Sequence, residues 1–245
     1  MSQPAPVRTA SPRVAHCATC EWRSSREWGV LDEEEIQLLD QAKSCHTYRP
    51  GQVIFYQGNP CVGMYDVLSG TVAIRKHDVQ GSCVLVRLVH EGQSLGYRTF
   101  FSGGTYAADA EALTTCTVCF IDKDALHQVL DRNVDLRNRF LQRVAQDLEH
   151  AEEAWLRQVA LPVRSRLSHL LLEMRGRFAT VSPDGTLTIE LPISRQDIAS
   201  TLGTRAETLA RTIRALADDG VAQFKGRTVT IADLDLLYDE VEAID

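Results

Sequence analysis

Short segments with alternating apolar and polar residues follow one another between residues 48 and 121. They read GQVIFYQGNP, VGMYDVLSG, TVAIRKHD, SCVLVRLVHEG and TTCTVCFID. A period of two is typical of strands with one buried face, and the segments end in turn residues such as Gly58-Asn59-Pro60 and Ser69-Gly70. The spacing of about ten residues per strand predicts a small antiparallel roll rather than parallel strands joined by helices.

The hydrophobic period then changes to that of a helix. Apolar residues recur at alternating intervals of three and four, at Leu141, Val144, Leu148, Ala151 and Trp155. Acidic residues lie on or beside this heptad seam, at Asp147, Glu149, Glu152 and Glu153. Such a seam requires a partner helix, and a second copy of the chain would supply one in a parallel homodimer. The alternative is that the helix packs on its own domain.

The C-terminal third combines helix caps with glycine breaks. After Pro162 we expect a helix, RSRLSHLLLEMRGRF, and a short strand, TLTIEL. Ser194 and Asp197 form a capping-box start, Gly203 breaks that helix, and Thr204 with Glu207 starts another. The ribbon VAQFKGRTVTI follows, so this stretch predicts a winged helix-turn-helix whose second helix enters the major groove.

These patterns predict an α+β chain with an N-terminal antiparallel β-roll, a long dimerisation helix and a C-terminal winged helix-turn-helix. The expected division is a cysteine-bearing segment at 1–30, the roll at 31–130, the helix at 131–160 and the DNA-binding domain at 161–245. A length of 245 residues is sufficient for two modest domains.

Charge is distributed unevenly along the chain. The net charge is −7, yet residues 160–230 hold ten Lys and Arg against seven Asp and Glu. The last fifteen residues, IADLDLLYDEVEAID, hold six acids and read as an acidic tail. Because phosphate contacts depend on local charge, the basic stretch remains compatible with DNA.

The seven cysteines indicate reduced thiols rather than a disulfide framework, because their number is odd and their spacing irregular. The longest apolar run, SHLLLEM, is too short to span a bilayer, and the first dozen residues lack the apolar core of a signal peptide. We therefore expect a cytoplasmic protein. A cupin-like metal set or a hydrolase nucleophile motif is not found, so we expect no enzyme activity.

In the order of its parts, the chain resembles the cyclic-AMP receptor protein superfamily of bacterial transcription factors. Members that bind cyclic nucleotides carry a Glu in the roll and an Arg-Ser pair that holds the phosphate. Tyr97 stands in place of that Glu, and Thr105 and Tyr106 in place of the pair. Without a bidentate guanidinium at this position, cyclic AMP is not expected as the effector.

The segment AETLAR at residues 206–211 resembles the E-x-x-S-R of the fumarate-nitrate-reduction regulator (FNR) branch, which reads a TTGAT half-site. The resemblance implies that Glu207 accepts from cytosine, Arg211 donates to guanine and Ala210 contacts a thymine methyl. The alternative for Glu207 is helix capping alone. Further DNA contacts are expected at the two helix starts, from Ser194, Arg195, Thr204 and Arg205. The implied partners are palindromic duplex DNA, a second copy of the chain and RNA polymerase.

FNR-branch proteins hold an oxygen-labile [4Fe-4S] cluster with three N-terminal cysteines and one from the roll. Cys17 and Cys20 match the first pair, and Cys119 matches the roll ligand. Strand alternation puts Cys116 on the opposite face, where we expect a core residue. Trp28 stands roughly where the third N-terminal cysteine would be.

The fourth ligand is open among Glu27, Asp32, His16 and Cys45. Three interpretations of the sensor follow: a cluster that responds to oxygen or nitric oxide, zinc or a reversible dithiol at the same cysteines, and haem or a small effector bound through His90 or His46. Cys61 and Cys83 are expected to be small buried hydrophobes.

Overall fold

The computed structural model describes residues 27–79 and 81–242. The chain divides into two compact units, one of Met1–Ser82 and Val86–Gln146 and the other of Cys83–Leu85 and Asp147–Asp245. No helix in the described part is both long and apolar enough to cross a bilayer.

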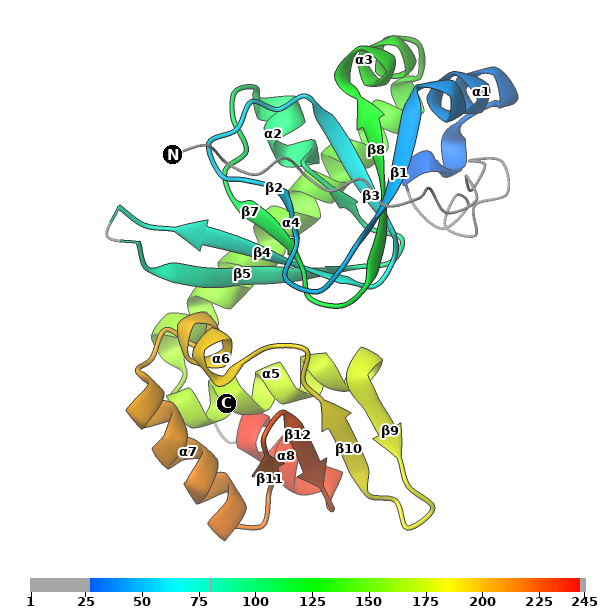
Figure 1. Cartoon of the computed structure of the whole chain (residues 1–245). Coiled ribbons are helices and arrows are strands. Elements are labelled where there is room, and N and C mark those ends of the chain that lie inside the picture. Colours follow the sequence, from blue (N-terminus) through cyan, green and yellow to red (C-terminus); the bar gives the residue numbers. More distant parts are fainter. Residues whose placement is uncertain (1–26, 80, 243–245) are drawn as a thin grey trace. The chain divides into compact units, whose positions relative to one another are not determined.

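Two four-stranded sheets form the roll, which makes up most of the first unit (Figure 1). One has the order β1 (Lys43–Tyr48), β8 (Cys116–Asp122), β3 (Gly63–Ser69) and β6 (Ser94–Leu95). The other has the order β2 (Val53–Phe55), β7 (Asp109–Ala112), β4 (Thr71–His77) and β5 (Cys83–His90). In the first sheet every neighbouring pair is antiparallel. The predicted antiparallel roll is confirmed, and the expected strand segments become β2, β3, β4, β5 and β8.

Short helices surround the sheets. They are the 3-10 helix η2 (Glu27–Val30) and the α-helices α1 (Glu33–Ala42), α2 (Tyr97–Ser102) and α3 (Lys123–Arg132). Both α1 and α3 contact β8, and Figure 1 shows them beside the β1 and β8 end of the roll. The first sheet is therefore covered on one face by helices, and side chains on both of its faces can be buried.

The turn between β3 and β4 requires glycine. Gly70 has a φ of +90°, and a Cβ built on it would lie 2.5 Å from the carbonyl oxygen of Thr115. Only a residue without a side chain accepts both the left-handed backbone and this close approach. The Ser69-Gly70 turn expected from the sequence thus has a steric cause.

Helix α4 (Val134–Ala160) follows α3 and runs for 27 residues. Its beginning belongs to the core of the first unit through Leu136 and Phe140. The Phe140 ring packs edge-on against Trp28, with ring centroids 5.3 Å apart, and also meets Phe101 at 5.4 Å. An aromatic cluster therefore ties the start of the long helix to the segment before α1.

The second unit contains α5 (Val163–Phe178), β9 (Ala179–Val181), β10 (Leu187–Glu190), α6 (Arg195–Thr201), α7 (Ala206–Asp218), β11 (Gln223–Lys225), β12 (Thr228–Ile231) and α8 (Leu234–Glu242). Its antiparallel sheet has the order β11-β12-β10-β9. The predicted winged helix-turn-helix is confirmed, with β11 and β12 as the ribbon after the second helix.

The acidic C-terminal stretch is not a simple tail, because most of it forms α8. Leu237 is fully buried on this helix, which packs against α5. The Arg164 guanidinium of α5 makes ion pairs with Glu240 of α8 and with Asp219. Apolar residues at helical spacing, together with this basic partner, explain why an acid-rich segment folds.

Replacing Phe140 by Ala should lower the free energy of unfolding by about 3–5 kcal/mol, because Phe140 is only 1% exposed and its removal leaves a cavity. Chemical denaturation followed by far-ultraviolet circular dichroism measures this change. Val62→Ala is the matched control, since Val62 is 53% exposed and its truncation should change the free energy of unfolding by less than about 0.5 kcal/mol. Equal losses would contradict the assignment of Phe140 to the core.

Candidate functional site

Capping at the start of α6 orients the helix-turn-helix. The Ser194 hydroxyl accepts a hydrogen bond from the Asp197 backbone N–H at 3.1 Å, and the Asp197 carboxylate accepts from the Ser194 N–H at 2.9 Å. This is the reciprocal capping box expected from the sequence. Two of the backbone donors at the helix start are thereby satisfied, so the first residue of α6 has a defined position.

The turn between α6 and α7 is held by the end of α4. Gly203 adopts a φ of +57°, and the Thr204 N–H donates to the Ala199 carbonyl at 2.9 Å. The Gln158 side chain donates to the Thr201 carbonyl at 2.6 Å, and its own oxygen accepts from Arg166. A side chain of the long helix thus contacts the backbone of the turn that places α7.

Helix α7 begins one residue later than the sequence predicts. Its N-cap is Arg205, without a side-chain capping hydrogen bond, so Glu207 occupies the second helical position. A capping box needs its acid at the third position, which is Thr208. The capping alternative for Glu207 therefore loses its geometric basis, and the carboxylate remains exposed at the start of the helix.

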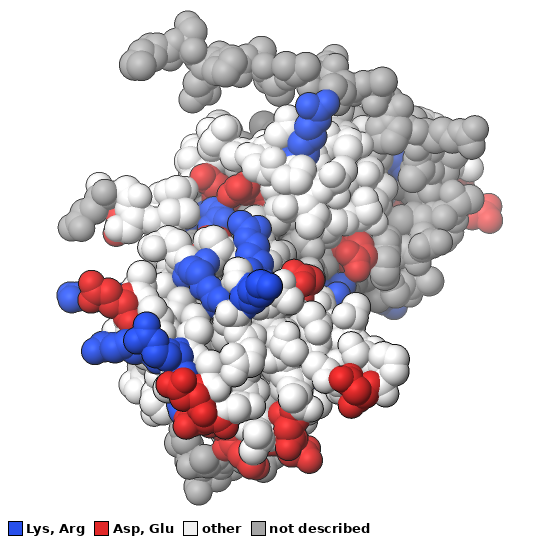
Figure 2. Space-filling model, turned by 60° about the horizontal axis from the view of Figure 1, so that its bottom comes forward, with Lys and Arg blue, Asp and Glu red and all other residues white. Residues whose placement is uncertain are grey.

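The exposed face of α7 carries the residues expected to read bases. Glu207, Ala210 and Arg211 are all exposed, whereas Leu209 and Leu216 are buried on the opposite face. An Arg211 guanidinium nitrogen donates to the Thr208 hydroxyl at 3.3 Å. In the view of Figure 2 several basic side chains lie near one another, while acidic side chains are scattered over the visible surface. An exposed acid and base one turn apart can meet neighbouring base edges.

Arg195 has a structural role that the sequence does not reveal. Its guanidinium donates to the Gly226 carbonyl at 2.9 Å and stacks over the Phe224 ring at 4.6 Å. Burial lowers the pKa of this guanidinium. Arg195 was expected to contact phosphate, but here it joins the start of α6 to the wing because a long aliphatic stem lets the head cross between them.

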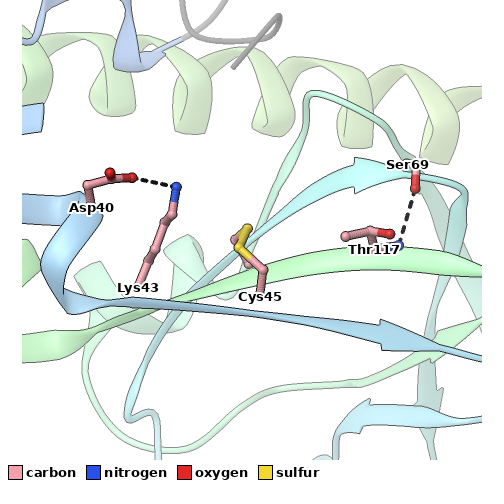
Figure 3. The surroundings of a disulfide bond; sticks show 6 residues. Asp40, Lys43, Cys45, Ser69 and Thr117 are labelled. Atoms are coloured by element: carbon pink, nitrogen blue, oxygen red, sulfur yellow. Dashed lines mark hydrogen bonds and ion pairs between the residues drawn. A yellow bond between two sulfur atoms is a disulfide. The ribbon is translucent and has the colours of Figure 1, made fainter. Parts of the chain in front are cut away.

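On the roll, the two cysteines Cys45 and Cys119 lie directly opposite each other. They are register partners on β1 and β8, with Cα atoms 3.9 Å apart, and a disulfide joins them. Figure 3 shows this bond on the same side of β1 as the Lys43 side chain, whose ammonium pairs with Asp40 at 2.6 Å. Reduced thiols were expected from the sequence, and for this pair the expectation is wrong because strand pairing brings together two cysteines that are 74 residues apart.

The row of residues that contains these cysteines continues onto β3. Asp66 is the register partner of Cys119 on the other side of β8. Its carboxylate accepts from the Ser94 hydroxyl at 2.6 Å and from the Trp28 indole N–H at 3.2 Å. Burial raises the pKa of Asp66 to about 6, and the two hydrogen bonds oppose that rise. Trp28, which stands roughly where the family resemblance would put a third N-terminal cysteine, therefore points at the same row as Cys119.

The structure describes only some of the expected cluster ligands. Cys17, Cys20 and His16 lie outside the described residues. The Asp32 Oδ1 atom accepts from the Glu35 N–H at 2.9 Å, so this carboxylate serves as the N-cap of α1. Within residues 27–79 and 81–242, no three His, Cys, Asp or Glu side chains are arranged to hold a metal ion.

The remaining cysteines differ in burial. Cys116 is fully buried in the core, its thiol donates to the Thr71 carbonyl at 3.2 Å, and burial raises its pKa. Cys61 is also buried, as expected. The same expectation for Cys83 is wrong: Cys83 is exposed, because it begins β5 next to a turn. Among the proposed haem ligands, His46 is exposed and the His90 Nδ1 lies 3.3 Å from the Thr71 hydroxyl.

Aromatic rings fill the roll where a cyclic nucleotide phosphate would require charge. Tyr97 is 1% exposed. The Tyr106 hydroxyl donates to the Gly63 carbonyl at 2.9 Å, and its ring stacks on Phe55 with centroids 4.1 Å apart. Thr105 is exposed and directly precedes Tyr106. These three positions therefore offer hydroxyl groups and ring faces, and a guanidinium comes from β5 instead, where Arg87 donates to the Tyr97 hydroxyl at 3.3 Å and lies over its ring at 5.7 Å.

The predicted seam of α4 is mostly open to solvent in the single chain. Leu141, Leu148 and Trp155 are 67%, 60% and 68% exposed. Val144 instead packs partly against the core of the first unit, and Ala151 is exposed. Leu156 and Val159 add further exposed apolar surface at 62% and 70%. Large apolar side chains exposed along one helix indicate an interface.

Sequence reasoning missed Asp66 and the pairing of Cys45. A carboxylate within the alternating segment VGMYDVLSG was a detectable signal, since its position shares a face with buried Met64. The pairing of Cys45 had no local signal, because the strand that carries it was not predicted.

Comparison with known proteins agrees with this architecture. Residues 45–133 match the cyclic nucleotide-binding domain family, and residues 165–240 match the Crp-like helix-turn-helix domain family. The transcriptional activator protein FnrL of Cereibacter sphaeroides is 26% identical over 234 residues, which cover 94% of this chain and 93% of FnrL. The cAMP-activated global transcriptional regulator CRP of Salmonella typhimurium is 26% identical over 76% of this chain and 88% of its own.

Solved structures show the same fold. FixK2 from Bradyrhizobium japonicum has a TM-score of 0.69 at 25% identity and covers 80% of this chain and 96% of its own. TTHA1359 of Thermus thermophilus, described as a transcriptional regulator of the CRP/FNR family, has a TM-score of 0.68 at 24% identity over 82% of this chain and 100% of its own.

A roll followed by a long helix and a winged helix-turn-helix with an exposed recognition face defines a DNA-binding transcription regulator. The chain belongs to the CRP/FNR family, whose members are dimeric regulators of transcription and not enzymes.

Arg195→Ala should lower the free energy of unfolding of the second unit by about 1 kcal/mol, because a hydrogen bond and a ring contact are lost. The salt dependence of DNA binding should stay unchanged. Thermal denaturation and fluorescence anisotropy at several salt concentrations measure the two effects. The control is Arg205→Ala at the exposed start of α7, which should reduce the salt slope by about one per bound subunit. A similar reduction for Arg195→Ala would make Arg195 a phosphate contact.

Proposed function

We propose that this chain is an FNR-type regulator that binds palindromic duplexes with TTGAT-like half-sites as a homodimer. Its activity would respond to oxygen, nitric oxide or redox state through an iron–sulfur cluster, and RNA polymerase would be its partner at promoters. The observation that carries the DNA-reading part is the exposed Glu207 and Arg211 pair at the start of α7.

Base recognition follows from the chemistry of this pair. The Glu207 carboxylate accepts from a cytosine amino group, and the Arg211 guanidinium donates two hydrogen bonds to guanine O6 and N7. Ala210, exposed between them, offers a methyl contact to thymine. The hydrogen bond from Arg211 to Thr208 holds the guanidinium along the helix before DNA is bound. Three further residues lie at helix starts: Ser194, Thr204 and Arg205. The free backbone N–H groups of a helix start donate to phosphate oxygens, so these positions suit contacts to the DNA backbone.

Dimerisation through α4 would bury the exposed Leu141, Leu148 and Trp155 against the same residues of a second copy. The twofold axis then repeats the α7 reading face, as a palindromic operator requires. Glu149, Glu152 and Glu153 are exposed beside this seam and would approach their counterparts. Their repulsion makes the dimer sensitive to small movements of the helix, on the scale of about 1–3 kcal/mol typical of allosteric coupling.

The donor set fits a cluster bound by thiolates. Cysteine thiolates are the normal ligands of iron–sulfur clusters. Cys119 and Cys45 bring two sulfurs to one place on the roll, and Cys17 and Cys20 add the N-terminal pair. Asp32 serves as the N-cap of α1, which favours Cys45 over Asp32 as the fourth ligand. When bound, the cluster would supply an oxygen-labile redox centre, and the thiolates of Cys17, Cys20, Cys119 and Cys45 would hold it.

The ring-filled roll supports an effector other than cyclic AMP. Tyr106 is anchored by its hydroxyl and by stacking on Phe55. A phosphate beside Tyr106 would have to break these contacts, and Thr105 and Tyr106 themselves supply no guanidinium to replace them. The alternative of direct dithiol sensing without a cluster is favoured by one observation, the disulfide between Cys45 and Cys119.

Arg211→Ala should weaken binding to a palindromic TTGAT duplex by about 1–3 kcal/mol, because the bidentate contact to guanine is lost. Binding to a scrambled duplex should be almost unchanged. Anisotropy titrations with both duplexes at one salt concentration measure the difference. Arg211→Lys is the matched control: it keeps the charge but lacks the planar fork, so it should lose specificity in the same way. A uniform loss on both duplexes would refute base recognition by Arg211.

Cys119→Ala should abolish the broad visible absorption of anaerobically purified protein, at roughly 400 nm for thiolate-bound iron, together with its iron and sulfide content. Cys116→Ala is the matched control on the same strand. Cys116 is buried on the opposite face, so its truncation should retain the chromophore and lower only the stability. If wild-type protein contains no iron, or if both variants lose it equally, the cluster assignment fails.

A further inference from the structure

We propose that Cys45 and Cys119 form a reversible disulfide, a redox modification site built into the roll. Strand pairing brings the two residues together: they are opposite each other in the β1–β8 register, with Cα atoms 3.9 Å apart. This is shorter than the separation of about 4.4–6.8 Å usual for disulfides, so the sulfurs are within bonding reach of each other. The strand register itself therefore brings the two cysteines together.

The two cysteine residues differ in their exposure to solvent. Cys45 lies on β1, an outer strand of its sheet, and is partly exposed. Cys119 lies on β8 between two strands and is only 4% exposed. Reagents in solution therefore reach Cys45 first, while Cys119 is positioned to react with Cys45 rather than with solvent.

Pairing with another described cysteine is disfavoured. Cys61 and Cys116 are free and buried, and the Cys116 thiol is directed at the Thr71 carbonyl inside the core. Cys83 is free and exposed at the start of β5. Its sheet is the one that contains neither β1 nor β8. Cys45 is therefore the described cysteine in register with Cys119.

The oxidant in this scheme is a low-molecular-weight disulfide such as glutathione disulfide. The Cys45 thiolate attacks one of its sulfurs, which forms a mixed disulfide and releases one glutathione thiolate. The Cys119 thiolate then attacks the Cys45 sulfur, closes the cross-strand disulfide and releases the second glutathione. Two protein thiols are oxidised, one small disulfide is reduced, and the two thiol protons end on the two released glutathione molecules.

The consequence for regulation rests on the proposed function. A sulfur in a disulfide is not a thiolate, so the oxidised roll offers neither Cys45 nor Cys119 to a cluster. Once a cluster has been lost, closure of the disulfide would prevent its reassembly until two electrons return. The thiol–disulfide state of the cell would then act on the regulator separately from oxygen.

Disulfide mapping on the metal-free, full-length chain tests the modification without any need for a cluster. The protein is reduced, freed of metal with a chelator, incubated anaerobically with glutathione disulfide, blocked with N-ethylmaleimide in denaturant, digested and analysed by mass spectrometry. We expect a linked peptide pair containing Cys45 and Cys119 that disappears with dithiothreitol, while Cys61 and Cys116 carry the blocking group. The proposal is overturned if Cys45 and Cys119 are both blocked, or if Cys119 is linked mainly to Cys17 or Cys20.

Two single variants test the order of the exchange. In Cys119→Ser, the mixed disulfide between Cys45 and glutathione should persist, because no second thiol resolves it. In Cys45→Ser, glutathionylation of buried Cys119 should be at least about tenfold slower, as its low exposure implies. Comparable rates in both variants would contradict the proposed order. Because these readouts use metal-free protein, absence of iron in the native protein would refute the cluster proposal and leave this one standing.

Discussion

The continuous antiparallel pairing of β1, β8 and β3 is the constraint on which the chemistry of the first unit depends. Because directly opposite residues of an antiparallel pair share one face, this register aligns Cys45, Cys119 and Asp66 in a single row. A shift of β8 by one residue would turn Cys119 toward the face that now holds Cys116, and Cys116 toward the face that now holds Cys119. The disulfide and the buried carboxylate hydrogen-bonded to Trp28 depend on this register, and so would the proposed cluster.

In the second unit, hydrogen bonds at helix ends and in the turn between α6 and α7 position the DNA-reading helix. The capping box of Ser194 and Asp197 starts α6, and the Gly203 turn leads into α7. The Gln158 side chain connects this turn to the end of α4. A displacement of the end of α4 would therefore move the backbone of the turn that positions α7. This hydrogen bond is a direct physical connection between the proposed dimerisation helix and the DNA-reading surface.

Local patterns were sufficient for much of the fold. The alternating segments became strands, and the caps and glycines placed α6 and α7 to within one residue. The start of α7 was predicted one residue too early because Thr204 and Glu207 have the residue types and spacing of a capping box. The N-cap is Arg205 instead. The strand β1 was missed because KSCHTY contains little apolar alternation and lies at a sheet edge, where only one neighbour constrains it.

The sequence by itself determined the class of protein. Hydrophobic period, helix caps and turn residues depend on residues close together in the chain, so they can be recognised without knowledge of the tertiary structure. It also determined which side chains of α7 face outward, since helical spacing separates Leu209 from Glu207 and Arg211. Only the tertiary structure decided the partners of Cys119 and Arg195. Those partners are Cys45 for Cys119, and Phe224 and Gly226 of the wing for Arg195. They are distant in sequence, and contacts between distant segments leave no periodic signal in either segment.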